Sequence, residues 1–141
     1  MPPTVIQTGL YLIRNVKFKN LAILPDANDE SALTANAIIE NHGDEKWNIT
    51  LLGNGNYHLS NLRNSRNAGC VNRSQKGDGI FGTDRAKQFV IKETRVKNQF
   101  TISPTDADLF WGLEDGEEST PITLQLTPTD GKNQWIFEST R

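Results

Sequence analysis

The chain has 141 residues, of which 35% are hydrophobic, and this length fits a single domain. Its net charge of −2 argues against a nucleic-acid-binding protein, which is usually basic, and no apolar run approaches the roughly 20 residues of a membrane-spanning helix. The segment MPPTVIQTGL lacks the basic and then apolar composition of a signal peptide, and the single cysteine excludes an internal disulfide. We therefore expect a monomeric cytoplasmic domain with neither a nucleic-acid nor a membrane partner.

Short alternating strands, rather than helices, are predicted along the whole chain. Each run is rich in β-branched or aromatic residues and is bounded by Gly, Asn, Asp or Pro. The expected strands in chain order are 9–16, 20–25, 33–40 and 45–52, then 56–62, 68–73, 79–83 and 87–96, and finally 98–103, 108–113, 120–127 and 133–138. The sequence therefore predicts an all-β protein.

Aromatic residues recur with a period of about 45 residues, which is a length typical of repeat architectures. One set opens the first strand of each repeat, namely Tyr11, Tyr57 and Phe100. A second set marks the last strand, namely Trp47, Phe89 and Trp135. Three repeats are too few for a propeller but suit a β-trefoil, in which such aromatics point into the core. We predict one β-trefoil domain over residues 1–141, with units of about 9–53, 54–97 and 98–139.

The sequence contains little that favours catalysis. The segment GDGIFG (77–82) matches a dinucleotide-binding pattern, but the strand before it and the helix after it are not predicted. Neither histidine has a nucleophile or a metal ligand at a suitable spacing, and Cys70 lies in an apolar run that favours a buried, inert thiol. We therefore predict that the protein is not an enzyme and has no cofactor and no metal site.

The aromatic openings of the units and the segment FWGLEDGEESTPITLQLTPTDGKNQWIFE resemble the mushroom β-trefoil protease inhibitors. The serine-protease type (mycospins) is the nearer likeness, and the cysteine-protease type (mycocypins) is a relative. The resemblance covers roughly residues 8–139. The resemblance implies that the protein inhibits proteases, and trypsin-like serine proteases in particular. An exposed loop of the inhibitor would enter the substrate cleft of the target protease.

Three loops offer candidate reactive residues for such an inhibitor. A trypsin-like pocket has an aspartate at its base and therefore requires Lys or Arg. The loop DANDES (26–31) has neither but would suit an asparagine-specific protease, whereas RNSRNAG (63–69) and TPTDGKN (127–133) are basic. The candidates are Lys132 and Arg66, which are favoured equally, followed by Arg63, Asn28 and Asn67. For each of them the alternative is a solvated turn residue.

The alternative function is carbohydrate binding. The segment NQWIF resembles the Q-x-W element of ricin-B-type lectins, which share the trefoil, and only Gln134 and Trp135 complete that element. The sugar-binding aspartate of those lectins follows the second strand of a unit, and Asp26 is the one candidate. A sugar site also needs an exposed aromatic, and one of Phe110 and Trp111 must face outward if their strand alternates. A third possibility is a defence or storage protein without inhibitory activity.

Overall fold

The computed structural model describes residues 5–37 and 43–140, and its described part is built from strands and one short 3-10 helix. In chain order the elements are β1 (Gly9–Asn15), β2 (Leu21–Ile23), β3 (Thr34–Asn36), β4 (Lys46–Leu51), β5 (Tyr57–Asn61), β6 (Asn67–Gly69), β7 (Phe81–Thr83), β8 (Phe89–Glu93), β9 (Phe100–Pro104), β10 (Phe110–Gly112), β11 (Thr120–Pro121), β12 (Thr123–Gln125), the 3-10 helix η1 (Gly131–Asn133) and β13 (Trp135–Ser139). Within those residues no helix is long and apolar enough to cross a bilayer.

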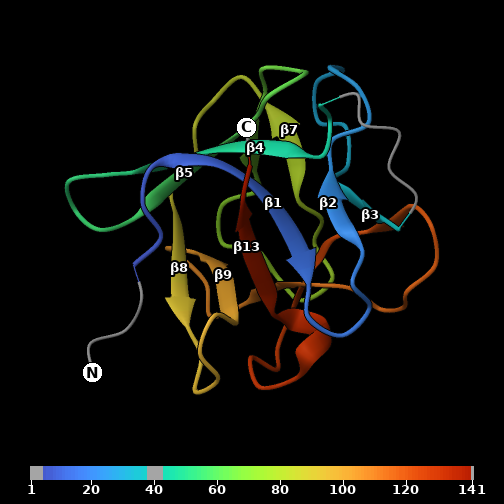
Figure 1. Cartoon of the computed structure of the whole chain (residues 1–141). Coiled ribbons are helices and arrows are strands. Elements are labelled where there is room, and N and C mark those ends of the chain that lie inside the picture. The colour runs from blue at the N-terminus through green and yellow to red at the C-terminus, as the bar shows by residue number, and fades with distance from the viewer. Residues whose placement is uncertain (1–4, 38–42, 141) are drawn as a thin grey trace.

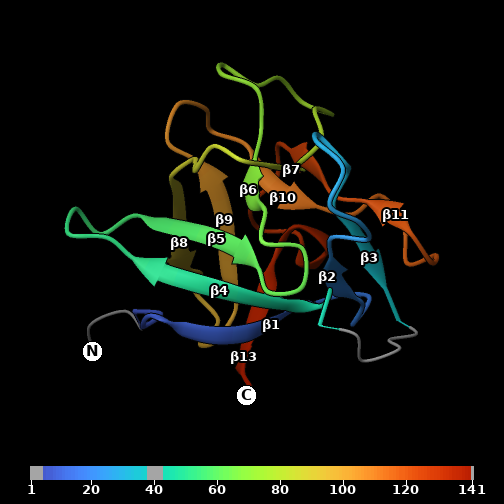
Figure 2. The same cartoon turned by 90° about the horizontal axis from the view of Figure 1, so that it is seen from above.

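Six of the strands close into a barrel. Each of β1, β4, β5, β8, β9 and β13 pairs antiparallel with the next, and β13 returns to β1 (Figure 1). Seen from above, β1, β4 and β5 lie side by side (Figure 2). Six of the other strands form hairpins, with β2 on β3, β6 on β7 and β10 on β12, and the short β11 pairs with β3. A closed barrel with one hairpin for each of three units is a β-trefoil, so the predicted fold class is confirmed.

The repeated aromatics account for the closure of each unit. The residue that opens a unit pairs in register with the residue that marks its last strand, in the couples Tyr11–Trp47, Tyr57–Phe89 and Phe100–Trp135. All six belong to the core or pack against it, and only Tyr11 is partly exposed. Burying such large rings in one place supplies much of the apolar surface that a small domain can remove from water.

The three residues that mark the last strands differ in one chemical respect. The indole N–H of Trp47 donates to the carbonyl of Ala22 at 3.0 Å, and that of Trp135 donates to the carbonyl of Trp111 at 2.8 Å. Phe89 has no such donor, and its ring instead packs edge-on against Trp111, with centroids 5.3 Å apart. Two of the three hairpins are therefore tied to the barrel by a buried hydrogen bond, and the second-unit hairpin is not tied in this way.

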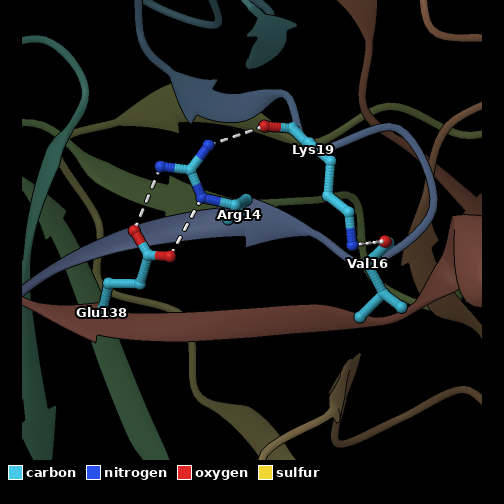
Figure 3. Close-up of polar contacts among 4 residues, drawn as sticks. All are labelled: Arg14, Val16, Lys19 and Glu138. Atoms are coloured by element: carbon cyan, nitrogen blue, oxygen red, sulfur yellow. Dashed lines mark hydrogen bonds and ion pairs between the residues drawn. The ribbon is translucent and has the colours of Figure 1, made fainter.

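An ion pair joins the first and last strands of the barrel. The Arg14 guanidinium on β1 binds both carboxylate oxygens of Glu138 on β13, at 3.0 and 3.1 Å (Figure 3). The same guanidinium donates to the carbonyl of Lys19 at 2.9 Å, and the ammonium of Lys19 donates to the carbonyl of Val16 (Figure 3). These contacts hold the β1–β2 turn against the seam where the barrel closes.

The hairpin strands are shorter than the sequence suggested. The predicted strand 33–40 is observed as β3 (Thr34–Asn36), and residues 38–40 lie outside the described part of the chain. The predicted strand 120–127 is two strands, because β11 pairs with β3 whereas β12 pairs with β10. Pro121 cannot donate a hydrogen bond to a ladder, and the pairing partner changes directly after it.

Candidate functional site

An open groove of about 350 Å³ lies in the second unit. Its walls are residues 69–72 at the end of β6, Phe81 and Thr83 on β7, and residues 85–87, which lead into β8. We call it the second-unit groove. The ring of Phe81 is partly exposed there, so an aromatic surface lies beside polar side chains.

A lysine connects the polar side of this groove to the third unit. The ammonium of Lys87 donates to the amide oxygen of Asn72 at 3.2 Å and lies 3.5 Å from the carboxylate of Asp106. Asp106 also accepts a hydrogen bond from the backbone N–H of Arg73 at 3.1 Å. That hydrogen bond first, and the charge of Lys87 second, hold the pKa of Asp106 below its ordinary value, so the carboxylate is ionised at neutral pH.

The other two units carry a buried asparagine where the third unit does not. The side-chain amide of Asn15 donates to the carbonyl of Lys132, and that of Asn61 donates to the carbonyl of Asp44. Each of these asparagines stands four residues after the aromatic that opens its unit, and Pro104 holds this position in the third unit. Proline has no side-chain amide, so Pro104 cannot donate such a bond to residues 84–88, the segment that leads into β8. In that segment Lys87 contacts Asn72 and Asp106 instead.

The cysteine in the wall of the groove is buried, as the sequence predicted. Burial raises the pKa of the Cys70 thiol, although a hydrogen bond with Ser74 acts in the opposite direction. A thiol in this state is protonated at neutral pH and is a poor nucleophile. The groove is therefore equipped for hydrogen bonding and stacking rather than for covalent chemistry.

The corresponding loop of the first unit is tied to the protein itself. Asp26 follows β2, as predicted, but its carboxylate accepts a hydrogen bond from the backbone N–H of Asn28 at 2.9 Å. The guanidinium of Arg66 donates to the carbonyl of Ala27 at 3.0 Å, and the amide of Asn64 donates to the carbonyl of Leu24 at 2.7 Å. The candidate sugar-binding aspartate thus stabilises its own turn.

The third unit has an acidic residue in a similar position. Asp115 accepts hydrogen bonds from the hydroxyl of Thr120 and from the backbone N–H of Glu117. These bonds, the one from Thr120 above all, hold the pKa of Asp115 below its ordinary value. Like Asp26, this carboxylate is engaged by its own loop.

The two adjacent aromatics of β10 face opposite ways. Trp111 is fully buried, and its indole nitrogen has no hydrogen-bond partner among the described residues. Phe110 is partly exposed and lines a larger groove of about 600 Å³. One of the pair was expected to face outward, and it is Phe110.

The candidate reactive residues lie in structured turns and strands. Lys132 belongs to η1 and is partly buried, and its backbone carbonyl accepts hydrogen bonds from Leu113 and Asn15. Its backbone N–H donates to the carboxylate of Asp130 at 3.1 Å. An inhibitory loop has to lie extended in a protease cleft, whereas this segment is a 3-10 turn anchored on both sides.

The remaining four candidates lie on two neighbouring loops. Arg63 is exposed in the β5–β6 turn, and Arg66 in the same turn points its guanidinium at the carbonyl of Ala27. Asn67 belongs to β6 and pairs with β5 and β7. Asn28 is exposed in the β2–β3 loop, which the hydrogen bond from Arg66 to Ala27 joins to the β5–β6 turn, whereas Lys132 lies in η1.

Comparison with known structures shows that the chain shares its fold with an agglutinin and two lectins. The Rhizoctonia solani agglutinin is 18% identical over 99% of this chain and 100% of its own, with a TM-score of 0.88. The ricin B-like lectin of Macrolepiota procera, solved with lactose, is 16% identical over 97% and 99%, with a TM-score of 0.86. The Polyporus squamosus lectin, bound to a sialylated trisaccharide, is 16% identical over 96% and 50%, with a TM-score of 0.77. No protein-family model and no curated protein sequence matches the chain.

These neighbours contradict the prediction of a protease inhibitor. The three structures named above are an agglutinin and two lectins, so the comparison favours the alternative, carbohydrate binding, over protease inhibition. The resemblance that suggested an inhibitor rested on the spacing of aromatic residues. That spacing is set by the packing of the barrel, which trefoil proteins of different function share.

The residues of the second-unit groove were not singled out from the sequence. Phe81 was read only as part of a glycine-rich hairpin, and Lys87 and Asp106 belong to different units. One signal was present in the sequence: the third unit has Pro104 at the position where the other two units have an asparagine. A break in an internal repeat can mark the place where one unit differs in function.

Proposed function

We propose that the protein binds carbohydrate and that the second-unit groove is its principal sugar site. The observation that carries this proposal is the partly exposed ring of Phe81 beside the hydrogen-bonded group of Asn72, Lys87 and Asp106. A sugar ring has an apolar C–H face that can stack on an aromatic, and it has hydroxyl groups around its edge. Ligand sites commonly combine such an apolar surface with a few fixed polar groups.

The polar groups offer both kinds of hydrogen bond that a sugar hydroxyl needs. Asp106 is ionised and accepts hydrogen bonds, while the ammonium of Lys87 and the amide nitrogen of Asn72 can donate. Hydrogen bonds to charged groups are stronger than those between neutral groups. Because Lys87 is held by two partners, it loses little freedom when a ligand binds.

The same geometry supports binding without catalysis. Glycoside hydrolysis requires two carboxyl groups on opposite sides of the scissile bond. The groove is lined by no Asp or Glu, and the nearby Asp106 is engaged by Lys87 and by the backbone of Arg73. We therefore infer that the bound sugar is recognised and not cleaved.

Titration with sugars tests this proposal. Isothermal calorimetry and amide NMR shifts would be measured for the full chain with lactose, galactose, N-acetylgalactosamine and glucose. We expect at least one of them to shift the resonances of residues 69–72 and 81–87. Shifts confined to another part of the molecule, or none at millimolar sugar, would overturn the assignment of the groove.

A pair of phenylalanine variants makes the test specific. Phe81→Ala should weaken sugar binding about three- to tenfold, as expected from the loss of an aromatic contact worth about 0.5–1.5 kcal/mol. Phe18→Ala is the matched control, because Phe18 is also a partly exposed phenylalanine but lines neither this groove nor the larger one beside Phe110. Circular dichroism of both variants would establish that they remain folded. Equal losses in the two variants would contradict the proposal.

A further inference from the structure

A second groove, which we call the Phe110 groove, is larger than the first and shares no residue with it. It measures about 600 Å³ and lies between the β8–β9 hairpin, the start of β10 and the loop before η1. Its lining consists of residues 92–96, Thr101, Phe110, Pro128, Thr129 and Gln134. This volume falls in the range of small-molecule sites, about 300–1,000 Å³.

One part of the Phe110 groove is apolar and rigidly supported. Phe110 turns its ring outward while its neighbour Trp111 is buried, and its strand is paired with β12. Val96 is 53% exposed and Pro128 is exposed, so both add apolar surface that remains in contact with water. The groove therefore offers a ring face and two aliphatic side chains to a ligand.

Another part of the groove carries positive charge that the protein does not neutralise. The side chains of Lys92 and Arg95 are exposed, and neither has a hydrogen bond or ion pair with another residue of the described chain. Glu93 is the one acidic residue in the lining, and its carboxylate already accepts a hydrogen bond from the backbone N–H of Asn98 at 2.9 Å. With two cations against one carboxylate, the lining carries a net positive charge and thus favours an anionic ligand.

Neutral polar groups complete the lining. Gln134 is only 7% exposed, and its amide nitrogen donates to the carbonyl of Pro128 at 2.8 Å. Its amide oxygen receives no hydrogen bond from any other described residue, and it can accept one from a ligand. The hydroxyl of Thr129 is exposed beside it. Both are suited to ligand hydroxyl groups.

We propose that the Phe110 groove is a second ligand site, selective for a sugar acid such as a hexuronic acid residue of a glycan. The sugar ring stacks on Phe110, its carboxylate lies between Lys92 and Arg95, and its hydroxyls bind Gln134 and Thr129. This inference extends the proposed carbohydrate function, but it does not depend on the second-unit groove. A sugar acid combines an apolar ring face, a carboxylate and hydroxyl groups in one ligand, and the lining of the groove offers a partner for each.

The decisive experiment compares an acidic oligosaccharide with its uncharged form. Trigalacturonic acid and its methyl ester would be titrated into the full chain by calorimetry and amide NMR. We expect the acid to bind about tenfold more tightly than the ester and to shift the resonances of Phe110, Thr129 and Gln134. The difference should shrink with added salt, because a partly exposed ionic contact is screened. Equal binding of acid and ester would overturn the proposal.

A matched pair of charge variants locates the carboxylate. Arg95→Gln should weaken binding of the acid about tenfold and leave binding of the ester unchanged. Lys97→Gln removes a positive charge from the same β8–β9 turn but from outside the lining, and it should leave both affinities unchanged. Equal losses in the two variants would show a general charge effect and would overturn the site.

The outcomes also separate this inference from the principal sugar site. If neutral sugars fail to bind but trigalacturonic acid binds in an Arg95-dependent manner, the second-unit groove fails and the Phe110 groove stands. If lactose binds in a Phe81-dependent manner and trigalacturonic acid does not bind, the Phe110 groove fails alone. Failure of both ligands overturns both assignments.

Discussion

Lys87 and Asp106 meet beside the second-unit groove, with the ammonium nitrogen 3.5 Å from a carboxylate oxygen, although they belong to different units of the trefoil. Their side chains are 16% and 33% exposed, and a pair with such exposure contributes less than about 1 kcal/mol to folding. The importance of the pair is positional. It fixes a donor and an acceptor beside the ring of Phe81, where a sugar hydroxyl could use both.

Replacing the acid should therefore affect binding more than stability. We expect Asp106→Asn to weaken sugar binding about three- to tenfold, because a charged acceptor is lost and Lys87 is no longer held. The free energy of unfolding should change by less than about 1 kcal/mol. Calorimetry and urea denaturation measure the two effects. Asp108→Asn, an exposed acid two residues further on, is the control. A similar loss of affinity in both variants would argue against a role for the pair.

The sugar affinity should be constant from neutral pH down to about pH 4.5 and should fall only at lower pH. The hydrogen bond from Arg73, and then the charge of Lys87, keep the pKa of Asp106 below its ordinary 3.8 in the folded protein. The Asp106 carboxylate therefore stays ionised until the pH falls through this lowered pKa. Below it the protonated carboxyl no longer accepts as a charged group, so both the sugar affinity and the stability that depend on the carboxylate are lost. Titrations at pH 7, 5 and 3.5 test this. Asp106→Asn should remove the decline at low pH, and a midpoint near pH 6 would point to another group.

The buried asparagines of the first two units should contribute strongly to stability. Asn61 is 1% exposed, donates to the carbonyl of Asp44 and accepts from the backbone N–H of Asn64. Asn61→Ala removes both hydrogen bonds, although the Asp44 carbonyl keeps the one from the backbone N–H of Leu24. With each bond contributing about 0.5–1.5 kcal/mol, the variant should lose about 1–3 kcal/mol of unfolding free energy. Urea denaturation measures the loss. Asn48→Ala, at an exposed position of β4, should change stability by less than about 0.5 kcal/mol. Similar values for the two variants would refute this account of the turn.

The indole hydrogen bonds of the core can be tested by a change that keeps the ring aromatic. Trp135→Phe removes the donor to the carbonyl of Trp111 and leaves a small cavity, so it should cost about 2–3 kcal/mol. Trp47→Phe should cost a similar amount, because Trp47 makes the same kind of bond to Ala22. Thermal and urea denaturation measure both. A loss below about 1 kcal/mol in either variant would mean that the hairpin carbonyl finds another partner.

The ion pair at the closing seam should contribute little. Arg14 and Glu138 have side chains that are 32% and 39% exposed, and such pairs couple by less than about 1 kcal/mol even with two hydrogen bonds. A double-mutant cycle of Arg14→Met and Glu138→Gln isolates the coupling, which should fall further in salt. A coupling above about 2 kcal/mol would show that the seam depends on the ion pair.

Part of the candidate site could have been predicted from the sequence, and part could not. The outward position of Phe110 or Trp111 follows from strand alternation, and the structure selects Phe110. The position of Asp26 after β2 was also foreseen, but its hydrogen bond to Asn28 was not. Whether a polar side chain in a loop is engaged by its own backbone depends on distances of a few tenths of an ångström. Residue type and spacing do not specify those distances.

The sequence by itself determined the all-β class, the three units and the aromatic core. These features follow from local alternation, from turn residues and from a repeat in which each opening aromatic pairs with the closing aromatic of its own unit. Only the tertiary structure decided which loops meet. Barrel closure brings Lys87 to Asp106, and it places Phe110 beside residues 92–96 and Gln134. Such contacts join segments that share no local pattern, because they depend on the register and closure of the whole sheet.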